Sequence, residues 1–324
     1  MNIPVELQQA IDALLTDKDS NKIRNDVSNI CRKYKYEIGQ GKRLVKTVDE
    51  VIAYAVARMP ATCSAVYQVL SYMNELYKEP ISSLLDFGSG TGAVSWAANE
   101  IFLLSSITCV EREKYMIDVA RKISSFGCAT MKNTKWIHAS ITSKLQLEKT
   151  DLVTAAYMMN ELEESEKRLF LEVLWNSANK VIVIIEPGTT IGYQNIMKAR
   201  EYFISEGANI IAPCTHNGVC ALEKGDWCHF SCRLQRNKLQ RYVKGGDAPF
   251  EDEKFSYIVV TKSHIEENKC SRIIRHPLIN KGYISVKVCS DAGVNAVKVT
   301  SKNKEAYKSI KKADWGDLVT INFK

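Results

Sequence analysis

The feature of this sequence that most constrains its fold is an alternation of short apolar runs with helical patterns, which begins near residue 81. The apolar or β-branched runs span residues 82–87, 106–111, 134–139, 151–157 and 180–187. Between them, segments 94–104 and 113–126 place apolar residues three and four positions apart, as amphipathic helices do. Strands that alternate with helices in this way are typical of βαβ units. The alternation therefore predicts an α/β chain with a mainly parallel sheet.

Helical spacing also extends over the first 79 residues, apart from a charged loop expected at 33–43. Pro60 interrupts this pattern, and because proline is tolerated only in a first turn, we expect a new helix to begin there. Beyond residue 187 the expected elements are a helix at 193–207, strands at 209–213 and 255–262, and a β-pair at 282–290 and 294–301. We divide the chain into an N-terminal helical region (1–79), an α/β domain (80–263) with a Cys-rich insertion (212–250), and a basic C-terminal region with β-strands (264–324).

A glycine-rich loop follows the first predicted strand in LLDFGSGTGAVSWAA, residues 84–98. Glycines at 88, 90 and 92 let the backbone turn tightly and approach a ligand closely, and Asp86 stands two positions before the first of them. The spacing is G-x-G-x-G, which differs from the G-x-G-x-x-G of dinucleotide-binding folds. The stretch resembles motif I of the class I S-adenosylmethionine-dependent methyltransferases, whereas a tight strand-to-helix turn is the alternative.

That resemblance implies a cofactor site made of Asp86, Gly88, Gly90, Gly92 and Glu111. Glu111 ends the second strand, where the family's acid binds the ribose hydroxyls of S-adenosylmethionine, and a carboxylate can accept two hydrogen bonds from such a diol.

The same resemblance makes Asn160 and Glu161, which follow the fourth strand, the candidates that face substrate; a helix cap is their alternative. The cofactor carries its own leaving group, so catalysis would chiefly require positioning. The acceptor atom stays open.

The net charge of +7 is concentrated in the C-terminal part of the chain. Residues 190–324 contain 22 Lys and Arg against 14 Asp and Glu, whereas residues 1–189 contain 22 against 23. Such a concentration is typical of proteins that bind a polyanion. A solvated lysine-rich surface is the alternative.

The segment APCTHNGVCALEKGDWCHFSC, residues 212–232, holds four of the ten cysteines. The first residues lack the pattern of a secretory or transit peptide, and no apolar run reaches membrane-spanning length, so we expect a cytoplasmic protein without disulfides. The cysteines lie six, eight and four positions apart, a spacing that matches neither C-x-x-C zinc ribbons nor ferredoxins. A metal site, with His216 and His229 as further possible ligands, and buried apolar cysteines both remain open.

With its surroundings, this segment is similar to the ribosomal small-subunit-associated methyltransferase-like family, which has bacterial and mitochondrial members. The family's A-P-C-P-H, D-W-C-H-F and upstream E-P-G patterns match residues 212–216, 226–230 and 186–188, with Thr215 in place of a proline. Its R-M-P-A-T and W-G-D patterns match residues 58–62 and 315–317.

The family resemblance implies a structural 4Fe-4S cluster, with zinc as the alternative metal. Carried over by position, the ligands are Cys214, Cys220, Cys228 and Cys289; Cys232 and Cys270 compete for the fourth place.

The function that this family implies is that of an S-adenosylmethionine-dependent methyltransferase that acts on or binds small-subunit ribosomal RNA. The alternative is a non-catalytic assembly factor. The expected partner is ribosomal RNA or a precursor of the small subunit, without membrane or DNA. The basic residues that follow the cysteines are the RNA-binding candidates: Arg233, Arg236, Lys238, Arg241 and Lys244.

Overall fold

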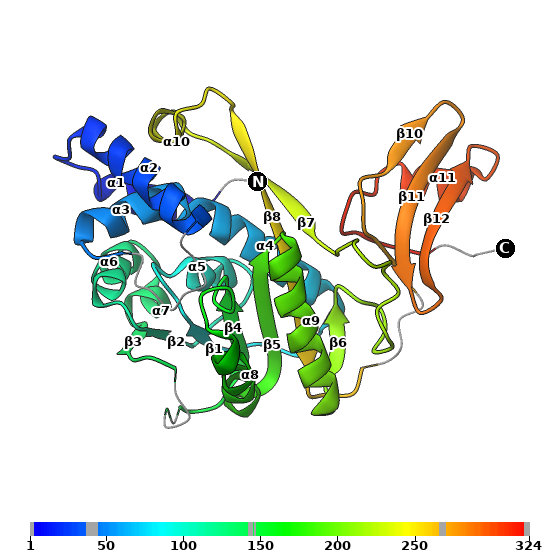
Figure 1. Ribbon diagram of the computed structural model, residues 1–324, viewed down its shortest axis with the longest axis horizontal. Helices are drawn as coiled ribbons and strands as arrows, with labels where there is room; N and C mark the ends of the chain where they lie inside the picture. The colour runs from blue at the N-terminus through cyan, green and yellow to red at the C-terminus, as the bar shows by residue number, and fades with distance from the viewer. Residues whose placement is uncertain (1–2, 37–44, 142–144, 146, 266–269, 321–324) are drawn as a thin grey trace.

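The computed structural model describes residues 3–36, 45–141, 145, 147–265 and 270–320, and its centre is an eight-stranded sheet (Figure 1). The strands are β1 (Ser83–Phe87), β2 (Ser106–Glu111), β3 (Lys135–His138), β4 (Thr150–Ala156), β5 (Ala178–Pro187), β6 (Asn209–Ala212), β7 (Phe230–Gln235) and β8 (Phe250–Thr261). Their order is β3-β2-β1-β4-β5-β8-β6, and β7 pairs with β8. Strands β1 to β5 are parallel, whereas β8 runs antiparallel to β5. This is the order of a class I methyltransferase sheet, and the predicted fold class is confirmed.

The helices of the first half are α1 (Val5–Ala13), α2 (Ser20–Tyr36), α3 (Val48–Ala57), α4 (Met59–Leu76), α5 (Ala93–Asn99), α6 (Lys114–Ser124) and α7 (Ala129–Lys132). Those of the second half are α8 (Glu164–Ser177), α9 (Thr190–Ser205), α10 (Lys238–Lys244) and α11 (Lys304–Ile310). Pro60 lies in the first turn of α4, as expected. None of the described helices is long and apolar enough to cross a bilayer.

One expected loop is partly helical. Helix α2 continues through residues 33–36, the start of the charged loop expected at 33–43, and the remainder of that loop lies outside the described residues. Lys33 in this last turn forms an ion pair with Glu50 of α3, at 2.6 Å between Nζ and Oε1. This tertiary contact stabilises a polar turn whose sequence alone carried no apolar periodicity.

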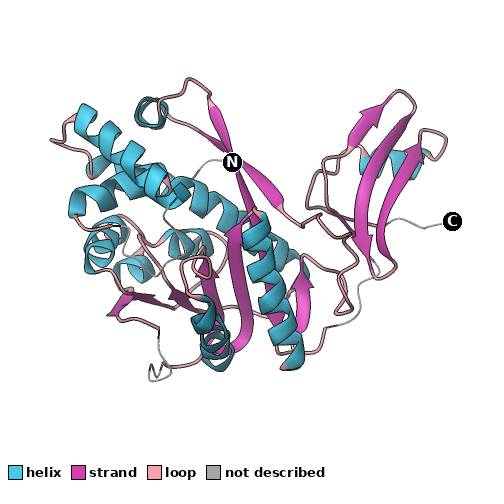
Figure 2. Ribbon diagram, in the orientation of Figure 1, coloured by secondary structure: helices cyan, strands magenta, loops and turns pink. Residues whose placement is uncertain are grey.

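The sheet buries both faces because successive strand residues point in opposite directions. Leu84 faces the layer that contains the N-terminal helices and α4 to α6, whereas its neighbour Leu85 packs with residues of α8 and α9. Figure 2 shows these helices on the two sides of the strands. The N-terminal helices therefore share a core with the sheet, and the division of the chain at residues 79 and 263 stays a prediction.

A second sheet lies beside the first and contains the C-terminal strands (orange and red in Figure 1). Its strands are β9 (Ser271–Ile273), β10 (Leu278–Asn280), β11 (Tyr283–Ser290), β12 (Gly293–Thr300) and β13 (Leu318–Val319). Strands β11 and β12 form the expected antiparallel pair and pack against α11.

The Cys-rich insertion contains more regular structure than the sequence indicated. Strand β7 and helix α10 were not expected, and β8 begins at Phe250 rather than at 255. The first residues of β8 are mostly charged, and they pair along β7 through contacts such as Arg233 with Asp252, at 2.7 Å between Nε and Oδ1. Cross-strand ion pairs of this kind support a strand that lacks apolar alternation.

The insertion is joined to the second sheet by a buried arginine. Arg272 of β9 is only 2% exposed; its Nε donates to the carbonyl of Pro213 at 3.0 Å and its Nη1 to the carbonyl of Gly316 at 2.7 Å. Its guanidinium also lies 5.3 Å from the ring centroid of Tyr72 on α4. The three contacts connect the insertion, both sheets and the N-terminal helices.

Candidate functional site

The predicted glycine loop lies at the carboxyl end of β1 and leads directly into α5. Gly88, Gly90 and Gly92 have φ angles of 65°, 52° and 89°, in the left-handed region that residues with a Cβ rarely adopt. A Cβ at Gly88 would stand 2.6 Å from the sulfur of Met158. Both backbone conformation and space therefore require glycine here.

Asp86 is completely buried beneath this loop. One carboxyl oxygen accepts a hydrogen bond from Thr154 Oγ1 at 2.7 Å, and burial raises the pKa of the carboxyl to about 7. The other oxygen, Oδ2, is buried without a partner among the described residues. Buried polar atoms without a partner are rare, so this oxygen fits a ligand group.

Glu111 lies at the end of β2, next to the same loop. Its Oε2 accepts the N–H of Gly90 and its Oε1 that of Glu113, both at 2.8 Å. Burial raises the pKa of Glu111, and these two hydrogen bonds act in the opposite direction. Each carboxylate oxygen has a second lone pair, so the side chain can still accept hydrogen bonds from a diol.

The substrate-facing candidates Asn160 and Glu161 lie in the turn after β4, on the side of Glu111. The carboxyl of Glu161 is 3.4 Å from Nη2 of Arg112, and burial raises its pKa to about 7. The alternative of a helix cap does not apply, because α8 is capped by Glu163.

The buried carboxyl of Glu186 holds this turn in place. Glu186 at the end of β5 accepts the N–H of Met159 at 2.9 Å and Nδ2 of Asn195 at 3.0 Å. It is completely buried, and burial raises its pKa to about 8. The only signal for this role was the Glu-Pro-Gly pattern after an apolar strand.

Aromatic residues of the N-terminal helices cover the glycine loop. The rings of Tyr34 and Tyr54 lie 5.2 Å apart, and the hydroxyl of Tyr54 is 3.9 Å from the position of a Cβ at Gly90. Nearby, Glu253 of β8 contacts Arg58 and the hydroxyl of Tyr157, each at 3.1 Å. No sequence pattern indicated this cover, because it depends on how α2 and α3 pack.

All four cysteines expected as metal ligands line one small cavity of about 30 Å³: Cys214, Cys220, Cys228 and Cys289. The cavity lies where the insertion meets β11. Cys232 is instead buried in the large core, and Cys270 lies 3.7 Å from Thr320. Neither competing cysteine, nor His216 or His229, is among the lining residues. The ten cysteines all fall in described parts of the chain, and none of them forms a disulfide.

The chemistry of this cavity suits thiolate ligands, although no three Cys, His, Asp or Glu side chains among the described residues are arranged to hold a single ion. Burial raises the pKa of Cys289 to about 12, and the charges of Arg200 and Arg272 oppose this shift. Four sulfur atoms around one cavity, with two arginines nearby, match the soft donor set that binds iron-sulfur clusters.

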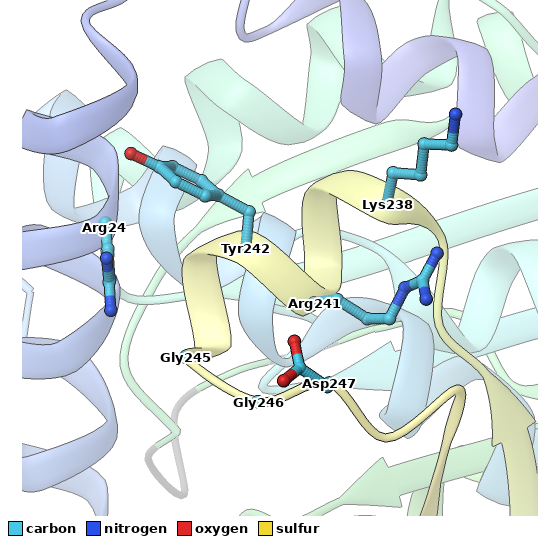
Figure 3. Close-up of a pocket in the computed structure, with 7 residues that line it drawn as sticks. All are labelled: Arg24, Lys238, Arg241, Tyr242, Gly245, Gly246 and Asp247. Atoms are coloured by element: carbon cyan, nitrogen blue, oxygen red, sulfur yellow. The ribbon is translucent and has the colours of Figure 1, made fainter.

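The five RNA-binding candidates divide into two groups. Arg233 pairs with Asp252, and Arg236 and Lys244 both pair with Glu251. Lys238 and Arg241 instead line an open pocket beside α2 (Figure 3).

Comparison with known protein families finds one family model that spans these features. A model described as mitochondrial small ribosomal subunit Rsm22 matches residues 48–320, which include the glycine loop, the four cysteines of the cavity and the second sheet. The chain belongs to this family. The resemblance stated from the sequence is thus confirmed.

Two kinds of relative illustrate the match. The human ribosome assembly protein METTL17, mitochondrial, is 25% identical over a gapped alignment of 326 positions. The alignment covers 93% of this chain and 68% of that protein. The mitochondrial Rsm22-cox11 tandem protein 2 of Schizosaccharomyces pombe is 27% identical over 86% of this chain, which spans only 44% of the yeast protein.

Solved structures include methyltransferases at low similarity. Magnesium protoporphyrin IX methyltransferase from Synechocystis with bound S-adenosylmethionine has a TM-score of 0.42 and 14% identity, over 76% of this chain and 98% of that one. The ribosomal protein L11 methylase of Lactobacillus delbrueckii subsp. bulgaricus has a TM-score of 0.38 and 11% identity, over 61% and 78%.

The expected cytoplasmic location is wrong. The family description and the relatives named above are mitochondrial, which points to mitochondria for this chain. The expectation rested on the composition of the first residues and on the lack of a long apolar run, whereas the family match rests on residues 48–320.

The buried carboxyl of Glu186 should make stability depend on pH. Its pKa rises from 4.5 to about 8 on folding, so the folded protein keeps a proton that the unfolded chain loses. The stability due to this proton is complete below pH 4.5 and is lost as the pH rises to 8. Relative to Glu186→Gln, the wild-type free energy of unfolding should therefore fall with pH in this window, by up to about 1.4 kcal/mol per pH unit.

Urea denaturation at a series of pH values measures this difference. The exposed Glu172→Gln on α8 is the control for loss of a carboxylate from the same region. If the difference in the free energy of unfolding between wild type and Glu186→Gln does not change with pH, the pKa of Glu186 is not raised on folding.

Proposed function

We propose that this chain is an S-adenosylmethionine-binding assembly factor of the mitochondrial small ribosomal subunit, which acts by binding the subunit's RNA. The observation that carries the proposal is the family match over residues 48–320, because it takes in the whole cofactor loop and the cysteine cavity. The name of the human relative, a ribosome assembly protein, supports the same role. The basic excess of residues 190–324 supports RNA as the partner.

The proposed cofactor site consists of the glycine loop with Asp86 and Glu111. The left-handed glycines leave room for the methionine part of the cofactor, and Glu111 would accept hydrogen bonds from the ribose hydroxyls. The unpartnered oxygen of Asp86 supports a polar ligand at this place. When bound, S-adenosylmethionine would supply a methyl group on a sulfonium leaving group, and the residues of the loop would orient it.

The proposed cluster ligands are the four cysteines of the cavity, and we assign a structural 4Fe-4S cluster to it. Three ligands come from the insertion and Cys289 comes from β11, so the cluster would join the insertion to the second sheet. Zinc, the alternative metal, would use the same four sulfur atoms. Arg200 supports the geometry by donating to the carbonyl of His216 at 3.3 Å and to that of Gly218.

Removing one proposed ligand tests the cluster. Protein purified without oxygen should be brown, with broad absorption near 400 nm and about four iron atoms per chain. Cys289→Ser should lose most of the iron and the colour, whereas Cys232→Ser should keep both, because Cys232 lies in the large core and not in the cavity. A colourless protein with one zinc, or iron loss only in Cys232→Ser, would refute the assignment.

Methyl transfer to small-subunit RNA is the second candidate function. It is favoured by the turn that holds Asn160 and Glu161 next to Glu111, which Glu186 fixes through the N–H of Met159. Such fixed geometry is what transfer from a sulfonium donor chiefly needs.

A substitution that blocks the cofactor site distinguishes an assembly factor from a methyltransferase. Gly90→Arg places a long side chain against Tyr54 at a backbone position with a φ of 52°, so calorimetry should show loss of S-adenosylmethionine binding. The variant should still bind RNA and support assembly of the small subunit if the chain acts as an assembly factor. Loss of assembly together with loss of labelled methyl transfer, in a folded variant, would favour the enzyme. Failure of the wild type to support assembly would refute the proposed function.

A further inference from the structure

An open pocket of about 540 Å³ lies between α2 and α10, two elements that are far apart in the sequence. Arg24 of α2 faces it from one side, and Lys238, Arg241 and Tyr242 of α10 line the other (Figure 3). Asp247, just after α10, is the one carboxylate among the lining residues. Three cations against one acid make the pocket positively charged.

The cations of this pocket are available to a ligand. In the described parts of the chain, none of Arg24, Lys238 and Arg241 takes part in an ion pair, and Nε of Arg241 is buried without a partner. The neighbouring Arg236 and Lys244 share Glu251, at 2.6 Å each. Glu251 and Asp252 of the β7–β8 hairpin, which includes α10, are therefore paired with other cations. Among the lining residues, the three cations of the pocket face Asp247 as their one acid.

The pocket is held in shape by contacts between its two walls. The hydroxyl of Tyr242 donates to Asn21 Oδ1 of α2 at 2.9 Å, and the guanidinium of Arg24 lies 5.5 Å from the centroid of the Tyr242 ring. Helix α10 begins in a capping box of Asn237 and Gln240 and ends at Gly245, with a φ of 67°. A binding surface that is set before the ligand arrives loses less entropy on binding.

We infer that this pocket binds the phosphodiester backbone of single-stranded RNA. The inference rests on the proposed function and deepens it, since it assigns the RNA contact to Arg24, Lys238 and Arg241. The cations are spread along the pocket and do not point at one spot (Figure 3), which suits successive phosphates of an extended chain. Tyr242 is 42% exposed, and its ring offers a face on which a base can stack. An acidic peptide would make no use of this ring.

The test measures how RNA binding by the full chain depends on salt. The probe is a fluorescein-labelled single-stranded RNA of about 20 nucleotides and mixed sequence, long enough for one binding groove. For single strands, the slope of log K against log salt changes by about 0.7 for each phosphate contact. The triple variant Arg24→Gln, Lys238→Gln, Arg241→Gln should therefore bind at least about 10-fold more weakly at low salt, with a slope smaller by about 2.

Two further variants keep the result clear. Arg24→Gln with Lys238→Gln changes only exposed side chains, should fold as the wild type does, and should reduce the slope by about 1.4. Arg233→Gln removes one positive charge from the β7–β8 hairpin, but from a side chain already paired with Asp252, and should leave the slope nearly unchanged. Thermal denaturation and S-adenosylmethionine binding check that each variant is folded.

The outcomes separate this inference from the function on which it rests. If the wild type binds RNA and the triple variant binds equally well with an equal slope, the pocket is not the RNA contact and the inference falls alone. If the triple substitution leaves RNA binding unchanged but abolishes direct binding of fluorescein-labelled polyglutamate, the pocket takes acidic protein, and the inference is again overturned. If the wild type does not bind RNA at any salt concentration, the proposed function falls as well.

Discussion

The buried guanidinium of Arg272 is the interaction on which the junction of the insertion, the second sheet and α4 depends. It is 2% exposed and is held by the carbonyls of Pro213 and Gly316 and by the ring of Tyr72. A buried charge is tolerated only where hydrogen bonds replace its water, so these partners must remain in place around it. A second contact, Asp226 with Lys287 at 2.9 Å, reinforces the same junction at its surface.

This junction also explains why the cysteines meet. Cys214 follows Pro213 directly, so the bond that anchors Arg272 also places the first cysteine, while Cys289 pairs with Arg272 itself between β11 and β9. The cavity therefore lies at the junction between the insertion and the second sheet. Helix α10, also in the insertion, reaches α2, where the basic pocket forms.

The sequence predicted the features that depend on local patterns. The apolar alternation indicated the parallel sheet, and three glycines after a buried strand indicated a loop that the structure places in left-handed conformations. Contacts between distant segments could not be predicted in this way. The covering pair Tyr34 and Tyr54, the role of Glu186 and the pairing of Arg236 with Glu251 each depend on packing that brings remote residues together. The basic residues after the cysteines thus looked equivalent in the sequence, and only two of them line the pocket.

The proposed role on the small ribosomal subunit of mitochondria can be tested by sedimentation of a mitochondrial extract through a sucrose gradient, with detection of the chain in each fraction. The chain should move with the small subunit or its precursors, and it should return to the top of the gradient after digestion with ribonuclease. If the chain stays at the top without digestion, even after chemical cross-linking before lysis, it does not act on the small subunit.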